Sequence, residues 1–195
     1  MLATIFFMKY YLCETDIIDY THASVQACAK ALSRGLNSDE EIARACFVYV
    51  RDEIAHTGDI KSDKVTVKAS EVLREKTGWC YAKSHLLAAL LRANKIPTGL
   101  CYQRLHCNEY KDGSYCLHGL NAIYLKEYGW YRVDARGNKE GVDAQFNPPT
   151  EKLAFVLEEG ESTIDKIYTK PLDNVVKLLS QPYNKMICNF PDIEI

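Results

Sequence analysis

Cys80 is the residue whose surroundings best suit it to covalent chemistry. Thr77 and Gly78 form a turn signal that leads through Trp79 into the cysteine, and residues 82–91 then place apolar side chains at helical spacing. We therefore expect the cysteine in the first turn of a helix, where unpaired N–H groups and the positive end of the dipole stabilise a thiolate. The alternative is a small buried hydrophobic residue, which is how most free cysteines behave.

A thiol nucleophile needs a base to take its proton and a third group to orient that base. Among the five histidines, His118 has the best geometric case. A hairpin whose turn is centred on Lys126 places His118 directly opposite Asp134, with Cβ atoms about 4.5–5.5 Å apart on one face. The carboxylate can then accept the imidazole N–H and support an imidazolium. The alternative is an ordinary cross-strand polar pair, and a slip of one residue would put the two side chains on opposite faces.

The other four histidines have weaker cases as the base. His85 lies five residues after Cys80 on the same predicted helix, which turns it to another face. His22 begins a surface helix, and His106 lies at a strand end. His56 has aspartates nearby, but its position favours a solvated helix end.

Acyl transfer also needs hydrogen-bond donors for a developing oxyanion. The backbone N–H of Cys80, at the start of its helix, is the natural first donor. Gln103, on a predicted strand at 100–104, is a candidate side-chain donor, and Trp79 is a candidate for oxyanion or substrate binding. The alternative for Gln103 is a polar residue on an edge strand.

The elements that must position these residues follow a helices-then-strands order, which is typical of an α+β fold. Ser38 and Glu41 form a capping box at the start of one helix, and Gly35 ends the helix before it. Lys111 to Ser114 reads as a hairpin turn. We expect helices at about 22–32, 38–54, 70–76, 80–93 and 173–180, and strands at 98–105, 117–125 and 130–134, with N-terminal helices and the cysteine-bearing helix packed on an antiparallel sheet.

A single domain over residues 1–195 is the expected organisation, because the chain has no repeats and no linker-like stretch. Its core is expected at about 65–155, with a helical N-terminal part at 1–64 and a C-terminal extension at 156–195. Since Met8 would also serve as a start, residues 1–7 are interpreted as an upstream extension.

The amino-acid composition limits the classes of partner and the cellular compartment that we expect for the protein. The net charge of −2 provides no basic field, so neither nucleic acid nor a membrane surface is an expected partner, and the oligomeric state stays open. Eight scattered cysteines without a CxxC pair indicate reduced thiols in the cytoplasm rather than a disulfide framework. The spacing of Cys101, His106, Cys107, Cys116 and His118 matches no zinc module, so we expect no metal and no cofactor.

Four stretches together resemble the transglutaminase-like cysteine-enzyme superfamily. They are Gly78 to Ala82, Leu90 to Pro97, His118, and Trp130 to Asp134, and the resemblance covers about residues 65–155. It implies a papain-like α+β core and a catalytic triad of the cysteine, the histidine and the aspartate. It also implies acyl transfer on amides through a thioester.

The sequence departs from the family pattern near the site. Leu120 stands where the family usually has tryptophan, and Ala135 follows the aspartate. Lys95 stands where glycine is more common at the helix exit. The first two changes leave the substrate class open.

A protease or amidase that acts on a peptide or on an amide-bearing small molecule is the favoured function. A transglutaminase-type amine acyltransferase and an inactive binding module of the same fold are the alternatives. Arg104, Arg132 and Arg136 near the site could favour an acidic substrate, although exposed arginines are more often only solvated.

Overall fold

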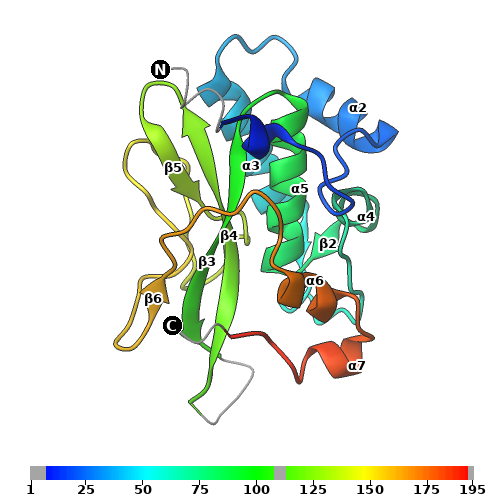
Figure 1. Ribbon diagram of the computed structural model, residues 1–195, viewed down its shortest axis with the longest axis vertical. Coiled ribbons are helices and arrows are strands. Elements are labelled where there is room, and N and C mark those ends of the chain that lie inside the picture. The colour runs from blue at the N-terminus through cyan, green and yellow to red at the C-terminus, as the bar shows by residue number, and fades with distance from the viewer. Residues whose placement is uncertain (1–7, 108–112, 193–195) are drawn as a thin grey trace.

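The cysteine-bearing helix, α5 (Cys80–Ala93), is the central element of the computed structural model, which describes residues 8–107 and 113–192. One side of α5 packs on an antiparallel sheet, and three N-terminal helices surround it elsewhere (Figure 1). Every residue from Cys80 to Arg92 is buried. A helix buried on all sides is a rigid support for the residue at its start.

The described elements confirm the expected α+β fold. The capping box predicted at Ser38 and Glu41 is formed at the start of α3. Before α5 the chain forms η1 (Lys9–Leu12), α2 (Ala23–Leu32), α3 (Asp39–Glu53), β1 (Ala55–His56), α4 (Ala69–Glu75) and β2 (Thr77–Gly78); after it come β3 (Thr98–His106), β4 (Tyr115–Leu125), β5 (Gly129–Val133), β6 (Ser162–Thr163), α6 (Asp173–Leu179) and α7 (Tyr183–Met186).

The main sheet has the strand order β5-β4-β3-β6, and its β4–β5 register differs from the predicted one. Leu125 pairs with Gly129, so the loop is 126–128 and its centre is not Lys126. Gly129 has a φ of 78°, a left-handed conformation that suits glycine, and it already belongs to the strand. The prediction that His118 lies directly opposite Asp134 was therefore wrong by two residues. Because side chains alternate with a period of two, the error leaves both residues on the same face.

A short parallel pair replaces the turn predicted at Thr77 and Gly78. Ala55 pairs with Thr77 and His56 with Gly78, which makes a two-stranded sheet of β1 and β2. This pairing brings the end of α3 beside the start of α5.

Two further expectations concern residues that are not described. Lys111 and Asp112 of the predicted hairpin turn lie outside the described residues, although β3 and β4 on either side of it pair antiparallel as expected. The proposed upstream extension at 1–7 also lies outside them.

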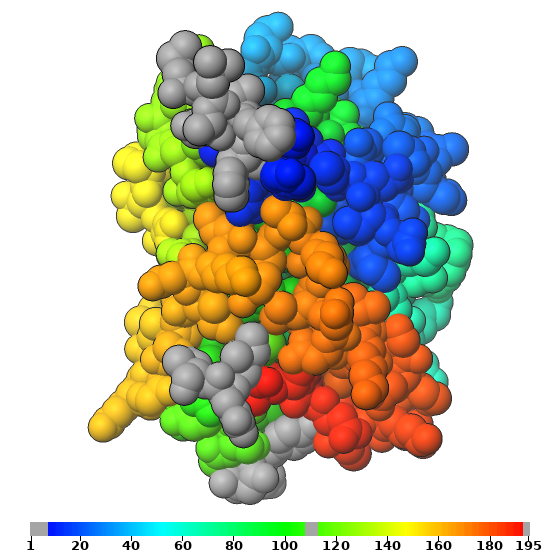
Figure 2. Space-filling view, in the orientation of Figure 1, coloured from blue at the N-terminus to red at the C-terminus, as the bar shows by residue number. Residues whose placement is uncertain are grey.

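The C-terminal segment packs against the same core as α5. Val175, Leu178 and Met186 belong to the hydrophobic cluster that contains the leucines of α5. Figure 2 shows this segment crossing one face of the molecule below the N-terminal residues. Its end reaches the sheet, where the N–H of Leu117 donates to the carbonyl of Pro191. Among residues 8–107 and 113–192, no helix has the length and apolar character that a membrane span needs.

Candidate active site

Cys80 is the first residue of α5 and is almost fully buried, with 8% of its surface exposed. No side chain caps this helix, so its first N–H groups are left for another partner. The N–H of Gly119 in β4 donates to the Cys80 sulfur at 3.5 Å. A Cβ atom at Gly119 would lie 2.9 Å from Cδ1 of Tyr81, so only glycine allows β4 to approach the helix start this closely.

His118 and Asp134 form a buried hydrogen-bonded pair. The imidazole Nε2 and a carboxylate oxygen of Asp134 are 2.7 Å apart. Asp134 is fully buried and also accepts hydrogen bonds from the N–H groups of Arg136 and Ala154. The carboxylate is therefore held in place independently of the histidine.

The electrostatics of this pair favour a charged imidazole. Burial lowers the pKa of His118, but Asp134 and Cys80 outweigh that effect and raise it well above its usual range. Burial likewise raises the pKa of Asp134, yet His118 and the two backbone N–H groups lower it overall. A histidine held between a thiol and a carboxylate can take up the thiol proton and keep it.

The histidine ring has one nitrogen left for the thiol. Asp134 occupies Nε2, and Cys80 is among the groups that raise the pKa of His118, so the thiol lies near the ring. Phe155 packs edge-on against the ring, with centroids 4.9 Å apart, and limits its rotation. The structure thus brings together the three residues that the sequence singled out, although the histidine and the aspartate are diagonal neighbours in the sheet.

Cys80 and His118 open onto a cavity of about 500 Å³, whereas Asp134 lies behind its wall. A cavity of this size holds a small molecule or part of a peptide. Its walls come from both edges of the sheet and from the segment after α3; they include His56, Asp59, Trp79, Cys80, His118, Arg136, Lys139, Phe155, Val156, Glu158, Glu161 and Phe190.

The two candidates for oxyanion or substrate binding have different positions. Trp79 lines the cavity, and its ring packs between His56 and Phe190 with centroid distances of 5.3 and 5.2 Å. Gln103 is buried beside His118, its register partner, and donates to Thr163 rather than lining the cavity. The alternative reading of Gln103 as an edge-strand residue also fails, because β6 pairs with it.

His56 is a cavity residue that the sequence interpretation missed. It was interpreted as a solvated helix end, but its side chain is only 8% exposed because the β1–β2 pairing folds it against Trp79. Its Nδ1 is 3.9 Å from Asp59, beyond a hydrogen bond. Asp59 is instead bound by Arg136, through both terminal nitrogens, and by Lys139 at 2.7 Å. The only signal in the sequence was the nearby aspartate, and its partners are far along the chain.

The remaining histidine near the site and the one on α5 have packing partners. His106 also lines the cavity and stacks on Tyr115, with ring centroids 4.5 Å apart. His85 is buried, and its Nδ1 lies 2.8 Å from the carbonyl oxygen of Val67. In the part of the chain that the structure describes, no three His, Cys, Asp or Glu side chains form a group suited to a metal ion.

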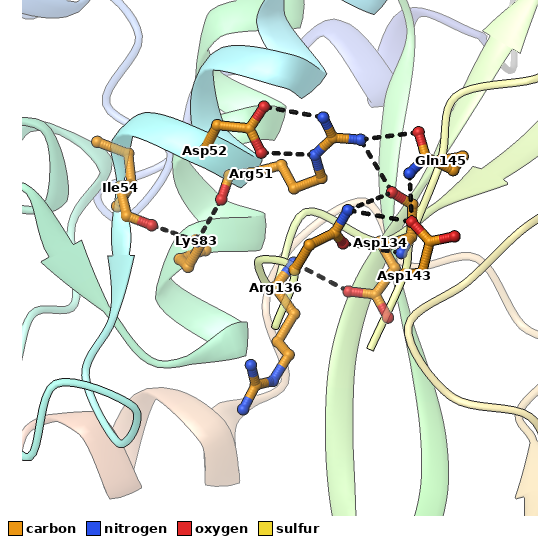
Figure 3. Close-up of polar contacts among 10 residues, drawn as sticks. Arg51, Asp52, Ile54, Lys83, Asp134, Arg136, Asp143 and Gln145 are labelled. Atoms are coloured by element: carbon orange, nitrogen blue, oxygen red, sulfur yellow. Dashed lines mark hydrogen bonds and ion pairs between the residues drawn. The ribbon is translucent and has the colours of Figure 1, made fainter. Parts of the chain in front are cut away.

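A buried lysine ties α5 to the end of α3 behind the site. Figure 3 shows the ammonium of Lys83 donating to the backbone carbonyls of Arg51 and Ile54. Burial, followed by the charge of Arg136, lowers the pKa of Lys83 to about 7. The same view shows Asp134 accepting the N–H of Arg136.

A solved structure with a TM-score above 0.5 supports the fold. A protein from Cytophaga hutchinsonii described as a candidate cysteine protease is 18% identical, with a TM-score of 0.51, and the match covers 65% of this chain and 40% of that one. A protein from Parabacteroides distasonis described as a candidate protease is 14% identical, with a TM-score of 0.43, and the match covers 85% of this chain and 30% of that one. The chain therefore spans less than half of the length of either protein.

Comparison at the level of sequence identifies the family. No curated protein sequence matches the chain. The transglutaminase-like superfamily, however, matches residues 26–135, more than half of the chain, and this range contains Cys80, His118 and Asp134. The chain belongs to the transglutaminase-like superfamily.

Proposed function

We propose that the protein is a cysteine-dependent acyl-transfer enzyme that cleaves an amide or ester through a thioester, most simply as a hydrolase. The observation that carries the proposal is the hydrogen-bonded pair of His118 and Asp134 near Cys80, with the thiol and the imidazole lining a cavity. A nucleophile, a base and an orienting carboxylate in contact are the parts that such chemistry requires.

In the first half of the reaction, His118 takes the thiol proton and the sulfur of Cys80 attacks the carbonyl carbon. The oxyanion that forms is stabilised by the backbone N–H of Cys80 at the uncapped start of α5. Collapse of this intermediate breaks the bond to the leaving group, which receives the proton from His118. A thioester remains on the enzyme.

In the second half, water or an amine attacks the thioester. His118 takes the proton of the incoming group and returns it to the sulfur, which regenerates the thiol. Asp134 keeps Nε2 engaged throughout and stabilises the imidazolium.

The proposed substrate is a peptide or an amide-bearing small molecule. The cavity has apolar walls at Trp79, Phe155 and Val156, together with charged groups that could orient a substrate. Because the nucleophile must stay reduced, we place the enzyme in the cytoplasm.

Formation of an acyl adduct on Cys80 tests this proposal. We expect p-nitrophenyl acetate to give a burst of nitrophenol and an acetyl group on the peptide that contains Cys80, detected by mass spectrometry. Cys80→Ala should abolish the burst with unchanged circular dichroism. The matched control is Cys28→Ala, which removes a half-buried thiol of α2 and should leave the burst intact.

A full burst in Cys80→Ala would refute the proposal. Absence of any adduct on Cys80 in the unmodified protein would favour the inactive binding module.

A further inference from the structure

We propose that the cavity contains a carboxylate-binding subsite formed by Lys139 and Arg136, which selects acyl donors that carry a free carboxylate near the reacting carbonyl. This inference rests on the proposed role of Cys80 and adds a substrate class to it. Cys80 lies on α5, His118 lies on β4 and Asp134 directly follows β5, whereas this subsite lies further along the loop after β5 and contacts Asp59 in the segment after β1.

The charges at this part of the cavity do not cancel. Arg136 and Lys139 are both cationic, and both bind the single carboxylate of Asp59. Two positive charges share one negative charge, so one net positive charge remains. A bound anion would be attracted to this cluster, and a neutral analogue of the same size would not.

Lys139 has the capacity to bind a ligand. Its ammonium has three donors, and Asp59 accepts one of them at 2.7 Å. The side chain is 48% exposed, so its remaining donors can reach a molecule in the cavity. Arg136, in contrast, is only 8% exposed and is fixed by a two-point contact with Asp59. The arginine therefore sets the position of Asp59, and the lysine is the adaptable donor.

His56 shapes this subsite without adding charge. Burial, followed by the charge of Arg136, lowers the pKa of His56 to about 3, so the ring is neutral at physiological pH. Its buried Nδ1 and the buried Nε1 of Trp79 have no hydrogen-bond partner among the described residues. Buried polar atoms normally have partners, which favours a polar ligand group or water beside this wall.

The opposite edge of the sheet has the opposite charge, and this gives the cavity a polarity. Arg136 and Lys139 follow β5 at one edge, whereas Glu158 and Glu161 precede β6 at the other. Glu161 is held by the backbone N–H groups of His106 and Glu158. A substrate with a carboxylate would place it toward the β5 edge and away from the glutamates.

Alkylation of Cys80 by two matched reagents tests the subsite. Iodoacetate and iodoacetamide deliver similar groups to the same thiol, and only the first carries a carboxylate. The rate of each is measured on the peptide that contains Cys80, and the ratio of the two rates removes any effect on the reactivity of the thiol itself.

We expect Lys139→Ala to lower the iodoacetate-to-iodoacetamide ratio by about threefold at low salt, which is the effect of one charge across a partly hydrated cavity. Lys139→Glu should lower it further, and ~0.5 M salt should reduce the difference between variants. The control Lys126→Ala removes an exposed lysine from the β4–β5 turn and should leave the ratio unchanged.

An unchanged ratio in both Lys139 variants, with thermal melting equal to that of the unmodified protein, would overturn the subsite. An equal drop in the Lys126→Ala control would also overturn it, because the effect would then come from overall charge. The test is separate from that of the proposed function, since the ratio can be measured even if Cys80 reacts slowly with both reagents and forms no acyl adduct.

Discussion

Two histidine–aspartate pairs have imidazoles that line the same cavity, and the two pairs have opposite electrostatics. His118 is 2.7 Å from Asp134, and His56 is 3.9 Å from Asp59. Both imidazoles are buried to a similar degree, with 7% and 8% of their side chains exposed. The pKa is nevertheless raised for His118 and lowered to about 3 for His56.

The difference lies in the distance to each carboxylate, in what else binds that carboxylate and, for His118, in the nearby Cys80. Asp134 accepts two backbone N–H groups and has His118 as its cationic partner. Asp59 is bound by Arg136 and Lys139, and the charge of Arg136 also acts on His56. A carboxylate turns a buried histidine into a base only when other cations have not already neutralised it.

Loss of the two imidazoles should affect catalysis very differently. We expect His118→Gln to lower the rate of Cys80 acylation by about 10²- to 10⁴-fold, because general-base assistance is lost. His56→Gln should change the rate by less than about tenfold, since no hydrogen bond or ion pair among the described residues joins His56 to Cys80 or His118. Single-turnover acylation by p-nitrophenyl acetate measures both rates.

Equal losses of the acylation rate in His118→Gln and His56→Gln would contradict the distinction between the two histidines. In that case His56 would also act on the thiol, and Arg136 and Lys139 beside it would have a catalytic role.

The two histidines should also give opposite pH dependences of stability. The folded state keeps His56 neutral down to a pKa of about 3, whereas the unfolded state protonates it below about pH 6.5. The protein therefore loses stability as the pH falls from about 6.5 to about 3. Between pH 7 and pH 4, the free energy of unfolding should therefore fall by about 2–3 kcal/mol less in His56→Gln than in the unmodified protein. Urea denaturation at a series of pH values measures this.

His118 should show the reverse sign. Its folded-state pKa is raised, so the stability that it contributes is fully present below about pH 6.5 and is lost as the pH rises through the folded-state pKa. The difference in unfolding free energy between the unmodified protein and His118→Gln should then become smaller as the pH rises. The same pH trend in both variants would contradict the assignment.

A smaller effect than that of His118→Gln is expected from the close approach of β4 to α5. Gly119→Ala puts a methyl group about where Tyr81 lies, so β4 must shift and His118 with it. We expect about a tenfold loss in the rate of Cys80 acylation. Gly99→Ala is the control, because its methyl group would meet Ile167 at 2.2 Å, in a part of the sheet that does not line the cavity.

Both glycine variants should lose stability, and only Gly119→Ala should lose reactivity. A reactivity loss in Gly99→Ala as large as that in Gly119→Ala would show that sheet strain in general, and not the approach to Cys80, controls the site.

Local signals in the sequence were sufficient for most of the fold. The capping box of Ser38 and Glu41, the glycine before Cys80, and the alternation along β3 and β4 each act within a few residues. Such signals are strong because the helix and strand periods determine which nearby positions are apolar. They located α3, α5 and the central strands to within a few residues.

The same signals were insufficient where the structure depends on pairing between distant residues. The strands β1 and β2 have two residues each, too few for a periodic pattern, and they meet only because α3 and α4 pack on α5. Hence the sequence did not reveal that His56 lies at the cavity. It also could not show that Arg136 and Lys139 bind Asp59, almost eighty residues away.

The register error illustrates why His118 and Asp134 nevertheless meet. Gly129 joins the strand, and the pairing shifts by two residues. A shift of one residue would have separated His118 from Asp134, whereas a shift of two makes them diagonal neighbours that still reach each other.

Nitrogen NMR of the histidine side chains tests the central claim most directly, because one spectrum reports both pairs. We predict that His118 is protonated on both ring nitrogens at pH 7.5, that His56 is neutral there, and that Cys80→Ala lowers the pKa of His118 while leaving His56 unchanged. A neutral His118 at pH 7.5, or a titration of His118 that is the same with and without the thiol, would contradict the account.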